Sequence, residues 1–335
     1  MDYVTLGSTG ITVNKNGFGA LPIQRVSESD GVYLLQKAYR SGIKFYDSAR
    51  GYFDSEMKIG VALSGVRDDI IIATKTMASD EATFTEHLEA SLSMLRTDYV
   101  DIFQFHNPPF CPKPGDSSGL YNAMLEAKAR GKVRHIGITS HRIEVAREAA
   151  ESGLYETIQY PFSYLASKEE IELIEFCAKR NIGVLAMKAL SGGLITDSAA
   201  AYAFMMQYSN VIPIWGIQRI SELEEFIAFH ESPPRLDDRA KSVIERDRAQ
   251  LGGEFCRGCG YCQPCPMKIG VSIAARMPLL IKRSDERFYL GEYCRQCMEH
   301  AAECTNCGHC AAHCPYGIDA PRLVKEGWIE YQKLL

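Results

Sequence analysis

Cysteines dominate the last 80 residues of this 335-residue chain, which hold ten of its 12 cysteines. Eight of them form a phrase that occurs twice, and both copies end in Cys-Pro. The first copy contains Cys256, Cys259, Cys262 and Cys265, and the second contains Cys304, Cys307, Cys310 and Cys314. Thiolates spaced by two residues and closed by Cys-Pro are typical of loops that bind iron–sulfur clusters. We therefore predict two [4Fe-4S] clusters, with the fourth cysteine of each copy turned by its proline toward the other cluster.

Other uses of these cysteines are weaker alternatives. Disulfides need an oxidising compartment, and the amino terminus has neither the basic start nor the apolar run of a secretory signal. The chain also lacks an apolar stretch of about 18 residues, so we expect a cytoplasmic protein without a membrane span. Zinc is the serious competitor, although a zinc ribbon separates its two ligand pairs more widely. In the first copy only two residues precede the last cysteine, so which cysteine crosses between clusters stays open.

Four cysteines fall outside the repeated phrase. Cys294 and Cys297 exceed the eight ligands that two clusters need, and we favour a packed pair of thiols over substitute ligands or a redox-active pair. Cys111 and Cys177 stand alone in the preceding domain and are interpreted as ordinary residues of it.

A second set of chemically capable residues lies near the ends of apolar runs in the first half of the chain. Asp47, Lys75 and His106 each end such a run, and Tyr52 follows the first of them closely. Each alone has an ordinary role, as a helix cap, a surface ion pair or a satisfied core histidine. Their joint placement favours a shared catalytic site instead.

The elements that carry these residues alternate in type. Between residues 17 and about 231, eight short apolar runs are each followed by a segment with helical spacing of apolar residues. The runs are Gly17–Leu21, Phe45–Ala49, Ile70–Lys75, Tyr99–His106, Val133–Thr139, Thr157–Phe162, Gly183–Leu190 and Val211–Ile217. Eight such units predict an α/β fold, a (β/α)8 TIM barrel, in which active sites lie at the carboxyl ends of the strands. A doubly wound sheet is disfavoured, because Gly17-Phe-Gly19-Ala-Leu-Pro22 is not its GxGxxG motif.

The remaining segments complete a two-domain prediction. Residues 1–16 suggest a hairpin that closes the bottom of the barrel. We expect the barrel domain at residues 1–240 and a small ferredoxin-like iron–sulfur domain at residues 241–335. Within the latter we expect helices over residues 272–293 and a closing helix over Arg322–Leu335. The net charge of −5, with both signs mixed along the chain, argues against nucleic acid or a membrane surface as a partner.

The barrel segment resembles the aldo-keto reductase superfamily. The resemblance rests on Phe45-Tyr-Asp47-Ser-Ala-Arg-Gly-Tyr52, Ala73-Thr-Lys75 and Asp101-Ile-Phe-Gln-Phe-His106, followed by Gly131-Lys-Val-Arg-His-Ile-Gly137, Gln159 and Leu190-Ser-Gly-Gly193. Ser55-Glu56 also fits. The resemblance covers residues 1 to about 231. The whole chain is similar to the branch with a carboxyl-terminal 4Fe-4S ferredoxin-type domain.

The resemblance implies reduction of a small carbonyl substrate by hydride from NADP(H) or NAD(H). Tyr52 would be the general acid, Lys75 would lower its pKa, Asp47 would hold Lys75, and His106 would orient the carbonyl. Nucleotide contacts are implied for Thr139, Ser140, Gln159, Met187, Gly192, Gly193, Gly216 and Arg219. Met187 stands where the family has a stacking tyrosine, and the family's Lys-Ser phosphate clamp is replaced by Gly216-Ile-Gln218-Arg219. Arg219 favours NADP through a 2′-phosphate, unless it is only a solvated loop charge.

Three functions are therefore open from the sequence. The first is a carbonyl reductase whose clusters are structural or regulatory. The second is an enzyme whose clusters exchange electrons with a redox partner or the substrate, although no flavin site is evident to split the two electrons of a nicotinamide. The third is a non-enzymatic, redox-sensing barrel, against which the complete tetrad argues.

Overall fold

The computed structural model describes residues 3–251 and 253–335, so Met1, Asp2 and Gly252 lie outside the described part. Contacts within the chain divide it into two compact units. The first consists of Met1–Ala189 and Ala199–Ala240, and the second of Leu190–Ser198 and Lys241–Leu335. The short segment Leu190–Ser198 thus belongs to the second unit although it follows a strand of the first.

The first unit is a closed barrel of eight parallel strands among the described residues, as the alternating apolar runs predict. Its strands are β3 (Gly17–Gly19), β4 (Phe45–Asp47), β5 (Ile71–Thr76), β6 (Val100–His106), β7 (Val133–Thr139), β8 (Thr157–Pro161), β9 (Gly183–Met187) and β10 (Val211–Gly216). They follow one another around the barrel in chain order, and β10 pairs with β3 to close it. All carboxyl ends therefore meet at one mouth.

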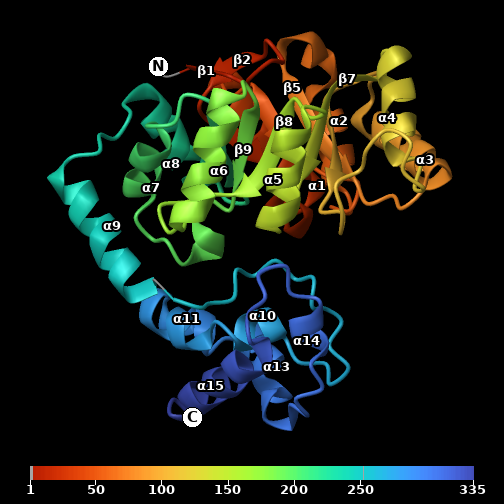
Figure 1. The fold of residues 1–335 in the computed structure, drawn as a ribbon. Coiled ribbons are helices and arrows are strands. Elements are labelled where there is room, and N and C mark those ends of the chain that lie inside the picture. The colour runs from red at the N-terminus through yellow and green to blue at the C-terminus, as the bar shows by residue number, and fades with distance from the viewer. Residues whose placement is uncertain (1–2, 252) are drawn as a thin grey trace. The chain divides into compact units, whose positions relative to one another are not determined.

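Helices surround the strands (Figure 1). They are α1 (Glu28–Arg40), α2 (Ser55–Leu63), α3 (Glu81–Leu95), α4 (Leu120–Ala129), α5 (Ile143–Ser152), α6 (Lys168–Lys179), α7 (Ser198–Met205) and α8 (Ile220–Glu231). Helix α6 shows why they form: Ser167 and Glu170 make a reciprocal capping box at its start. Leu173, Ile174 and Cys177 then recur at helical spacing and are buried, which stabilises the helix against the barrel.

An antiparallel hairpin of β1 (Tyr3–Thr5) and β2 (Thr12–Asn14) precedes the barrel, as predicted. Val4, Leu6 and Val13 belong to a buried cluster that includes apolar residues of five barrel strands. The turn after β1 approaches the start of β9 so closely that a Cβ on Gly7 would lie 2.4 Å from the Asn181 oxygen. Gly7 also has a φ of +52°, which L side chains rarely adopt.

We expect Gly7→Ala to destabilise the barrel clearly more than Gly10→Ala does. Both glycines have positive φ, so both alanines incur the left-handed strain of about 1–2 kcal/mol. A Cβ on Gly10 meets nothing within 4 Å, whereas the one on Gly7 meets backbone and adds an overpacking cost of about 1–3 kcal/mol. Thermal and chemical denaturation of the two variants checks the difference. Equal losses of stability would mean that the hairpin does not pack on the barrel as described.

The second unit is helical within the described residues. Its helices are α9 (Asp238–Leu251), which begins at the end of the first unit, α10 (Val271–Ala274), α11 (Met277–Arg283), α12 (Glu286–Tyr289), α13 (Glu292–Glu299), α14 (His309–Ala312) and α15 (Ala320–Gln332). Helix α15 buries Leu323, Val324 and Tyr331. Its Gly327 is required by close packing, because a Cβ there would lie 1.8 Å from the Ala274 oxygen of α10.

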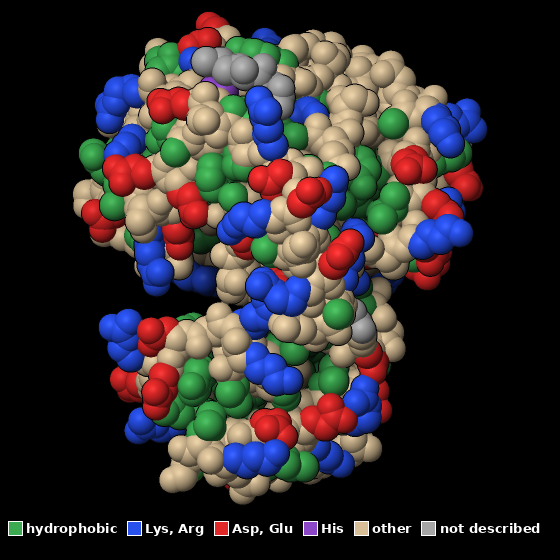
Figure 2. All heavy atoms as spheres, turned by 90° about the vertical axis from the view of Figure 1, so that its left-hand side faces the viewer, with side chains coloured by type: hydrophobic (Ala, Val, Ile, Leu, Met, Phe, Trp, Pro, Cys, Tyr) green, Lys and Arg blue, Asp and Glu red, His purple; other side chains and the backbone are tan. Residues whose placement is uncertain are grey.

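The molecular surface carries interspersed charges. Figure 2 shows Lys or Arg and Asp or Glu side chains alternating over the face that it presents, in keeping with the mixed charge of the sequence. Within the part of the chain that the structure describes, every helix is too short or too polar to cross a membrane.

Candidate active site and cysteine site

The barrel mouth contains a buried ion pair. Asp47 is the last residue of β4 and Lys75 is the penultimate residue of the adjacent β5. The Lys75 ammonium donates to both carboxylate oxygens of Asp47, at 2.8 and 2.9 Å, and to the Ser48 carbonyl. Their side chains are only 5% and 1% exposed. Burial raises the pKa of Asp47 and lowers the pKa of Lys75, and the attraction within the pair opposes both changes.

Tyr52 and His106 lie beside this pair. Tyr52 is in the loop between β4 and α2, and His106 ends β6. Their rings meet edge to face with centroids 5.8 Å apart. The Lys75 ammonium lies 5.1 Å from the centroid of the Tyr52 ring. The structure therefore brings the four predicted residues of the tetrad together at one place.

The expected effect of Lys75 on Tyr52 is wrong in one respect. Burial raises the pKa of the Tyr52 phenol well above its usual value, and the nearby Asp47 carboxylate raises it further. The Lys75 ammonium, which is hydrogen-bonded to Asp47 and Ser48, does not bring the pKa of Tyr52 below its usual value. Tyr52 is thus protonated throughout the neutral range and can donate a hydrogen bond.

His106 is neutral at this site. Burial lowers the pKa of His106 to about 3, with a smaller contribution from the positive charge of Lys75. Its Nδ1 atom is buried and makes no hydrogen bond to the described residues. A neutral imidazole presents one N–H donor and one acceptor, so it can orient a carbonyl oxygen without adding charge.

Gln104 is a site residue that the sequence analysis missed. Its side-chain amide donates to Gln159 Oε1 at 2.7 Å, and Gln159 Nε2 donates to Asp47 Oδ2 at 3.3 Å. This chain of hydrogen bonds links three strands across the barrel. The available signal was the two-residue period of β6, which places Gln104 on the same side of the strand as His106.

Three of the residues with left-handed backbone directly follow residues of the candidate site. Phe53, Asn107 and Lys188 have positive φ values of 40°, 53° and 56°, and none is glycine. Phe53 follows Tyr52 directly, Asn107 follows His106, and Lys188 follows Met187. Such conformations cost about 1–3 kcal/mol each and occur most often at functional sites. Their positions support the barrel mouth as the working face.

The predicted nucleotide contacts of the barrel occupy three strand ends. Thr139 and Ser140 are buried after β7, and Gln159 is buried in β8. The Thr139 hydroxyl points to the Met187 sulfur at 3.9 Å, while the Ser140 hydroxyl is engaged in a turn with Arg142. Gly216, which ends β10, and Arg219, which follows it, are exposed. Thr139, Gln159 and Met187 are thus brought together by adjacent strands, whereas Arg219 is an exposed residue that directly precedes α8.

Gly192 and Gly193 belong to the second unit. They form a short 3-10 turn with Ser191, and the three residues have φ values of 48°, 65° and 90°. A Cβ on Gly193 would meet nothing within 4 Å, so space is open beside this backbone.

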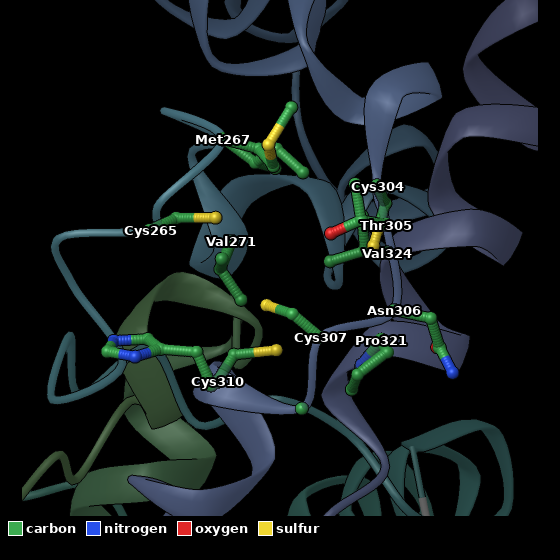
Figure 3. A pocket seen from close by; sticks show the side chains of 13 residues that line it. Cys265, Met267, Val271, Cys304, Thr305, Asn306, Cys307, Cys310, Pro321 and Val324 are labelled. Atoms are coloured by element: carbon green, nitrogen blue, oxygen red, sulfur yellow. The ribbon is translucent and has the colours of Figure 1, made fainter.

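The cysteines of the second copy surround a cavity. Cys304, Cys307 and Cys310 line it together with Cys265 from the first copy. Figure 3 shows the sulfur atoms of Cys265, Cys307 and Cys310 directed into the same space, which Val271 and Val324 also border. The last cysteine of the first copy therefore lies with the first three of the second.

The first copy shows the reciprocal arrangement. Burial raises the pKa of the Cys256 thiol, the Gly258 N–H and the Arg276 charge oppose this, and the neighbouring thiols of Cys259 and Cys314 add smaller increases. Burial also raises the pKa of the Cys262 thiol, and the nearby thiols of Cys256 and Cys259 make smaller contributions in the same direction. Among the described residues, no three His, Cys, Asp or Glu side chains approach closely enough to hold one metal ion.

The cysteines outside the phrase occupy protected positions. Cys111 and Cys177 are buried in the first unit. Cys294 is fully buried on α13, and Cys297, one turn later, packs on Gly270. Burial raises the pKa of both Cys294 and Cys297, which does not favour reactive thiolates.

Comparison with known proteins decides the family of the barrel. The model of the aldo/keto reductase family matches residues 15–200, more than half of the chain. The chain belongs to the aldo/keto reductase family. The matched residues end before the cysteine-rich segment, so the family assignment concerns the barrel.

Relatives of this aldo/keto reductase cover most of the barrel. The L-galactose dehydrogenase of Arabidopsis thaliana is 29% identical over 211 residues, which are 57% of this chain and 66% of that protein. The NADH-specific methylglyoxal reductase of Escherichia coli strain K12 is 28% identical over 231 residues, which are 59% of this chain and 70% of that protein. The chain thus spans about two thirds of the length of these relatives.

Solved structures share the fold of the aldo/keto reductase barrel. The holo form of AKR11C1 from Bacillus halodurans has a TM-score of 0.65 at 22% identity, covering 74% of this chain and 96% of that one. An aldo-keto reductase of Klebsiella pneumoniae in complex with NADPH has a TM-score of 0.62 at 20% identity, covering 73% of this chain and 95% of that one. At these identities the likeness concerns the fold.

Proposed function

We propose that the barrel mouth reduces a small aldehyde or ketone to an alcohol with NADPH or NADH as the reductant. The observation that carries the proposal is the arrangement of protonated Tyr52 and neutral His106 beside the buried Asp47–Lys75 pair. One NADH-specific relative and one NADPH-bound structure of the same fold support a nicotinamide nucleotide. The substrates of individual relatives differ, and methylglyoxal is a reasonable first choice for assay because the bacterial relative reduces it.

His106 and Tyr52 have different roles at the carbonyl oxygen of the substrate. A bound nicotinamide nucleotide supplies the hydride that adds to the carbonyl carbon. His106 and the Tyr52 hydroxyl hydrogen-bond the carbonyl oxygen, and Tyr52 then gives it a proton. Although burial raises the pKa of Tyr52, the alkoxide that would otherwise form is a stronger base still, so the transfer is downhill.

Lys75 acts on the Tyr52 phenolate that remains after the proton has been transferred. When Tyr52 has lost its proton, the phenolate is left in a buried site, where an isolated charge is costly. The ammonium of Lys75 stabilises that charge, and Asp47 holds the ammonium in position. Gln104 and Gln159 restrain Asp47 in turn.

The chain offers a donor set that fits a nicotinamide nucleotide. Gln159, Thr139 and Ser140 supply an amide and two hydroxyls, and Met187 supplies a polarisable side chain. The turn at Gly192 and Gly193 has open space beside Gly193 that a pyrophosphate could enter. Gly216 has no side chain that would keep a nucleotide away from this part of the backbone. The exposed Arg219 would favour NADPH by binding its 2′-phosphate.

The proposal is tested by following nicotinamide absorbance. The anaerobically purified protein is mixed with NADPH or NADH and a panel of short aldehydes that includes methylglyoxal. We expect substrate-dependent oxidation of the nucleotide, faster with NADPH. A protein that oxidises neither nucleotide with any aldehyde or ketone would contradict the proposed function.

We also propose that the cysteines hold two [4Fe-4S] clusters. Cys256, Cys259, Cys262 and Cys314 would bind one, and Cys304, Cys307, Cys310 and Cys265 the other. The shared cavity of the second set supports this division, as do the influence of Cys304 and Cys265 on Cys310 and that of Cys259 and Cys314 on Cys256. Zinc is the alternative that metal analysis decides.

We expect Cys265→Ser to lower the iron content and the visible absorbance by about half, because one cluster loses a ligand. The matched control is Cys297→Ser in the same unit, which should leave both unchanged if Cys297 is a packed thiol. Iron analysis and absorbance spectra of anaerobic samples provide the measurement. A colourless wild-type protein that contains zinc would rule out the cluster assignment.

A further inference from the structure

The turn expected to receive the nucleotide pyrophosphate is built into the cysteine-rich unit. The segment Leu190–Ser198 belongs with Lys241–Leu335 by its contacts, although β9 leads directly into it. Ser191, Gly192 and Gly193 all have positive φ, which glycine adopts freely and which is strained only at Ser191. One side chain of the helical part of the unit contacts this turn.

That side chain is Arg276, which is only 7% exposed. Its backbone connects α10 and α11, and its carbonyl accepts hydrogen bonds from Leu279 and Leu280 at 2.9 Å, so its origin is rigid. The guanidinium Nη2 donates to the Gly192 carbonyl at 2.6 Å. This hydrogen bond joins the turn to the helical part of the unit.

The other side of the guanidinium lies against the first cysteine copy. A Cβ on Gly258 would come within 2.8 Å of Arg276 Nη1, so the guanidinium lies directly against this glycine, whose φ of +62° also disfavours a side chain. The Gly258 N–H donates to the Cys256 sulfur at 3.4 Å. Arg276 is thus enclosed between Gly192 of the turn and Gly258 of the cysteine loop, with 3.5 Å to a Cβ built on Gly192.

Arg276 is also short of partners. Its Nε atom is buried and has no hydrogen-bond acceptor among the described residues. A guanidinium keeps its charge in proteins, and a buried charge without compensation is costly. Thiolates that ligate a cluster bring negative charge to one side of Arg276, and a pyrophosphate would bring it to the other. Arg276 is therefore placed to interact with the negative charge of the cluster thiolates and with that of the pyrophosphate.

We propose that Arg276 is a positioning residue that ties the Ser191–Gly193 turn to the first cysteine loop, so that cluster loading and nucleotide binding strengthen each other. The inference rests on the proposed function. A loaded cluster fixes the loop around Gly258, which fixes Arg276 and the carbonyl of Gly192. Because coupling between two ligands is reciprocal, bound nucleotide should equally protect the cluster from loss.

The test compares nucleotide affinity in four states of the full chain. NADPH dissociation constants are measured by fluorescence titration for wild type and Arg276→Gln, each before and after removal of iron with a chelator. We expect iron removal to weaken NADPH binding to wild type by at least about fivefold. In Arg276→Gln the affinity should already be weak and should not fall further. The matched control is Arg322→Gln, an exposed arginine of the same unit, which should behave as wild type.

Further measurements separate this role from a merely structural one. Visible absorbance reports whether Arg276→Gln still carries its cluster, and if it does not, Arg276→Lys is used, which keeps the charge but loses the forked donor. In the steady state we expect the KM for NADPH to rise while kcat at saturating nucleotide changes little. The rate of absorbance loss with chelator should fall when NADPH is present in wild type, and not in Arg276→Gln.

Three outcomes would overturn the inference. Equal effects of iron removal on wild type and Arg276→Gln would show that Arg276 does not carry the coupling. Equal NADPH affinity in all four states would show that no coupling exists, while leaving the reductase intact. A wild-type protein that binds no nicotinamide nucleotide at all would remove the proposed function and this inference with it.

Discussion

Replacing Tyr52 with phenylalanine is expected to lower kcat for carbonyl reduction by about 10²–10⁴-fold. The change removes the only atom that donates the proton in the proposed reaction and leaves the ring in place against His106. Nucleotide affinity should remain as in wild type, because the hydroxyl contributes to the carbonyl and not to the nucleotide. Steady-state rates at saturating NADPH, together with a fluorescence titration of NADPH, provide the measurement.

The matched control for this variant is Tyr33→Phe, which removes the hydroxyl of an exposed tyrosine on α1 and should leave the rate unchanged. The pH profile offers a second reading. Burial raises the pKa of Tyr52 and lowers that of His106 to about 3, so neither group changes protonation near neutral pH and the wild-type rate should be flat there. A Tyr52→Phe enzyme within about threefold of wild type would exclude Tyr52 as the general acid.

Replacing Lys75 with methionine is expected to abolish activity and to destabilise the barrel by about 3–5 kcal/mol. The variant leaves the Asp47 carboxylate buried, with the 3.3 Å hydrogen bond from Gln159 as its remaining side-chain partner among the described residues. Asp47 escapes part of this cost by taking up a proton, since burial already raises its pKa. The loss of stability should therefore shrink as pH falls. Chemical denaturation of the barrel at several pH values measures it.

The double variant Asp47→Asn with Lys75→Met separates stability from catalysis. Removing both charges together should recover most of the lost stability, because no unpaired charge remains buried, while activity stays absent. Lys44→Met is the matched control, because Lys44 pairs with Asp69 at a more exposed site and should cost no more than about 1 kcal/mol. A Lys75→Met protein as stable as the Lys44→Met protein would contradict a buried, mutually dependent pair.

The barrel and the placement of its tetrad followed from the sequence for a simple reason. Parallel strands in a closed barrel all end at one mouth, so residues that end apolar runs are brought together whatever the details of packing. Asp47, Lys75 and His106 satisfy this condition, and Tyr52 follows Asp47 by only five residues. The alternation of side chains along β6 also places Gln104 on the side of His106, but only the contact of Gln104 with Gln159 reveals its role.

Other features depend on packing between segments far apart in the chain. Burial and Asp47 raise the pKa of Tyr52. The expectation of a lowered pKa considered only the charge of Lys75. The pairing of Cys265 with the second copy became visible only from the cavity that they share. Arg276 lies in an apolar stretch of the sequence without any motif, and its contact with Gly192 spans 84 residues.

The central claim is that hydride passes directly to the carbonyl carbon at the barrel mouth, and isotope transfer tests it most directly. The full-length protein with its clusters is incubated with NADPH that carries deuterium at the transferable position and with an aldehyde that it reduces. Mass spectrometry of the alcohol then reports where the label goes. The proposed mechanism predicts one deuterium on the former carbonyl carbon of each product molecule. An alcohol free of deuterium, formed while NADPH is oxidised, would show that electrons travel by another route and would contradict the assignment.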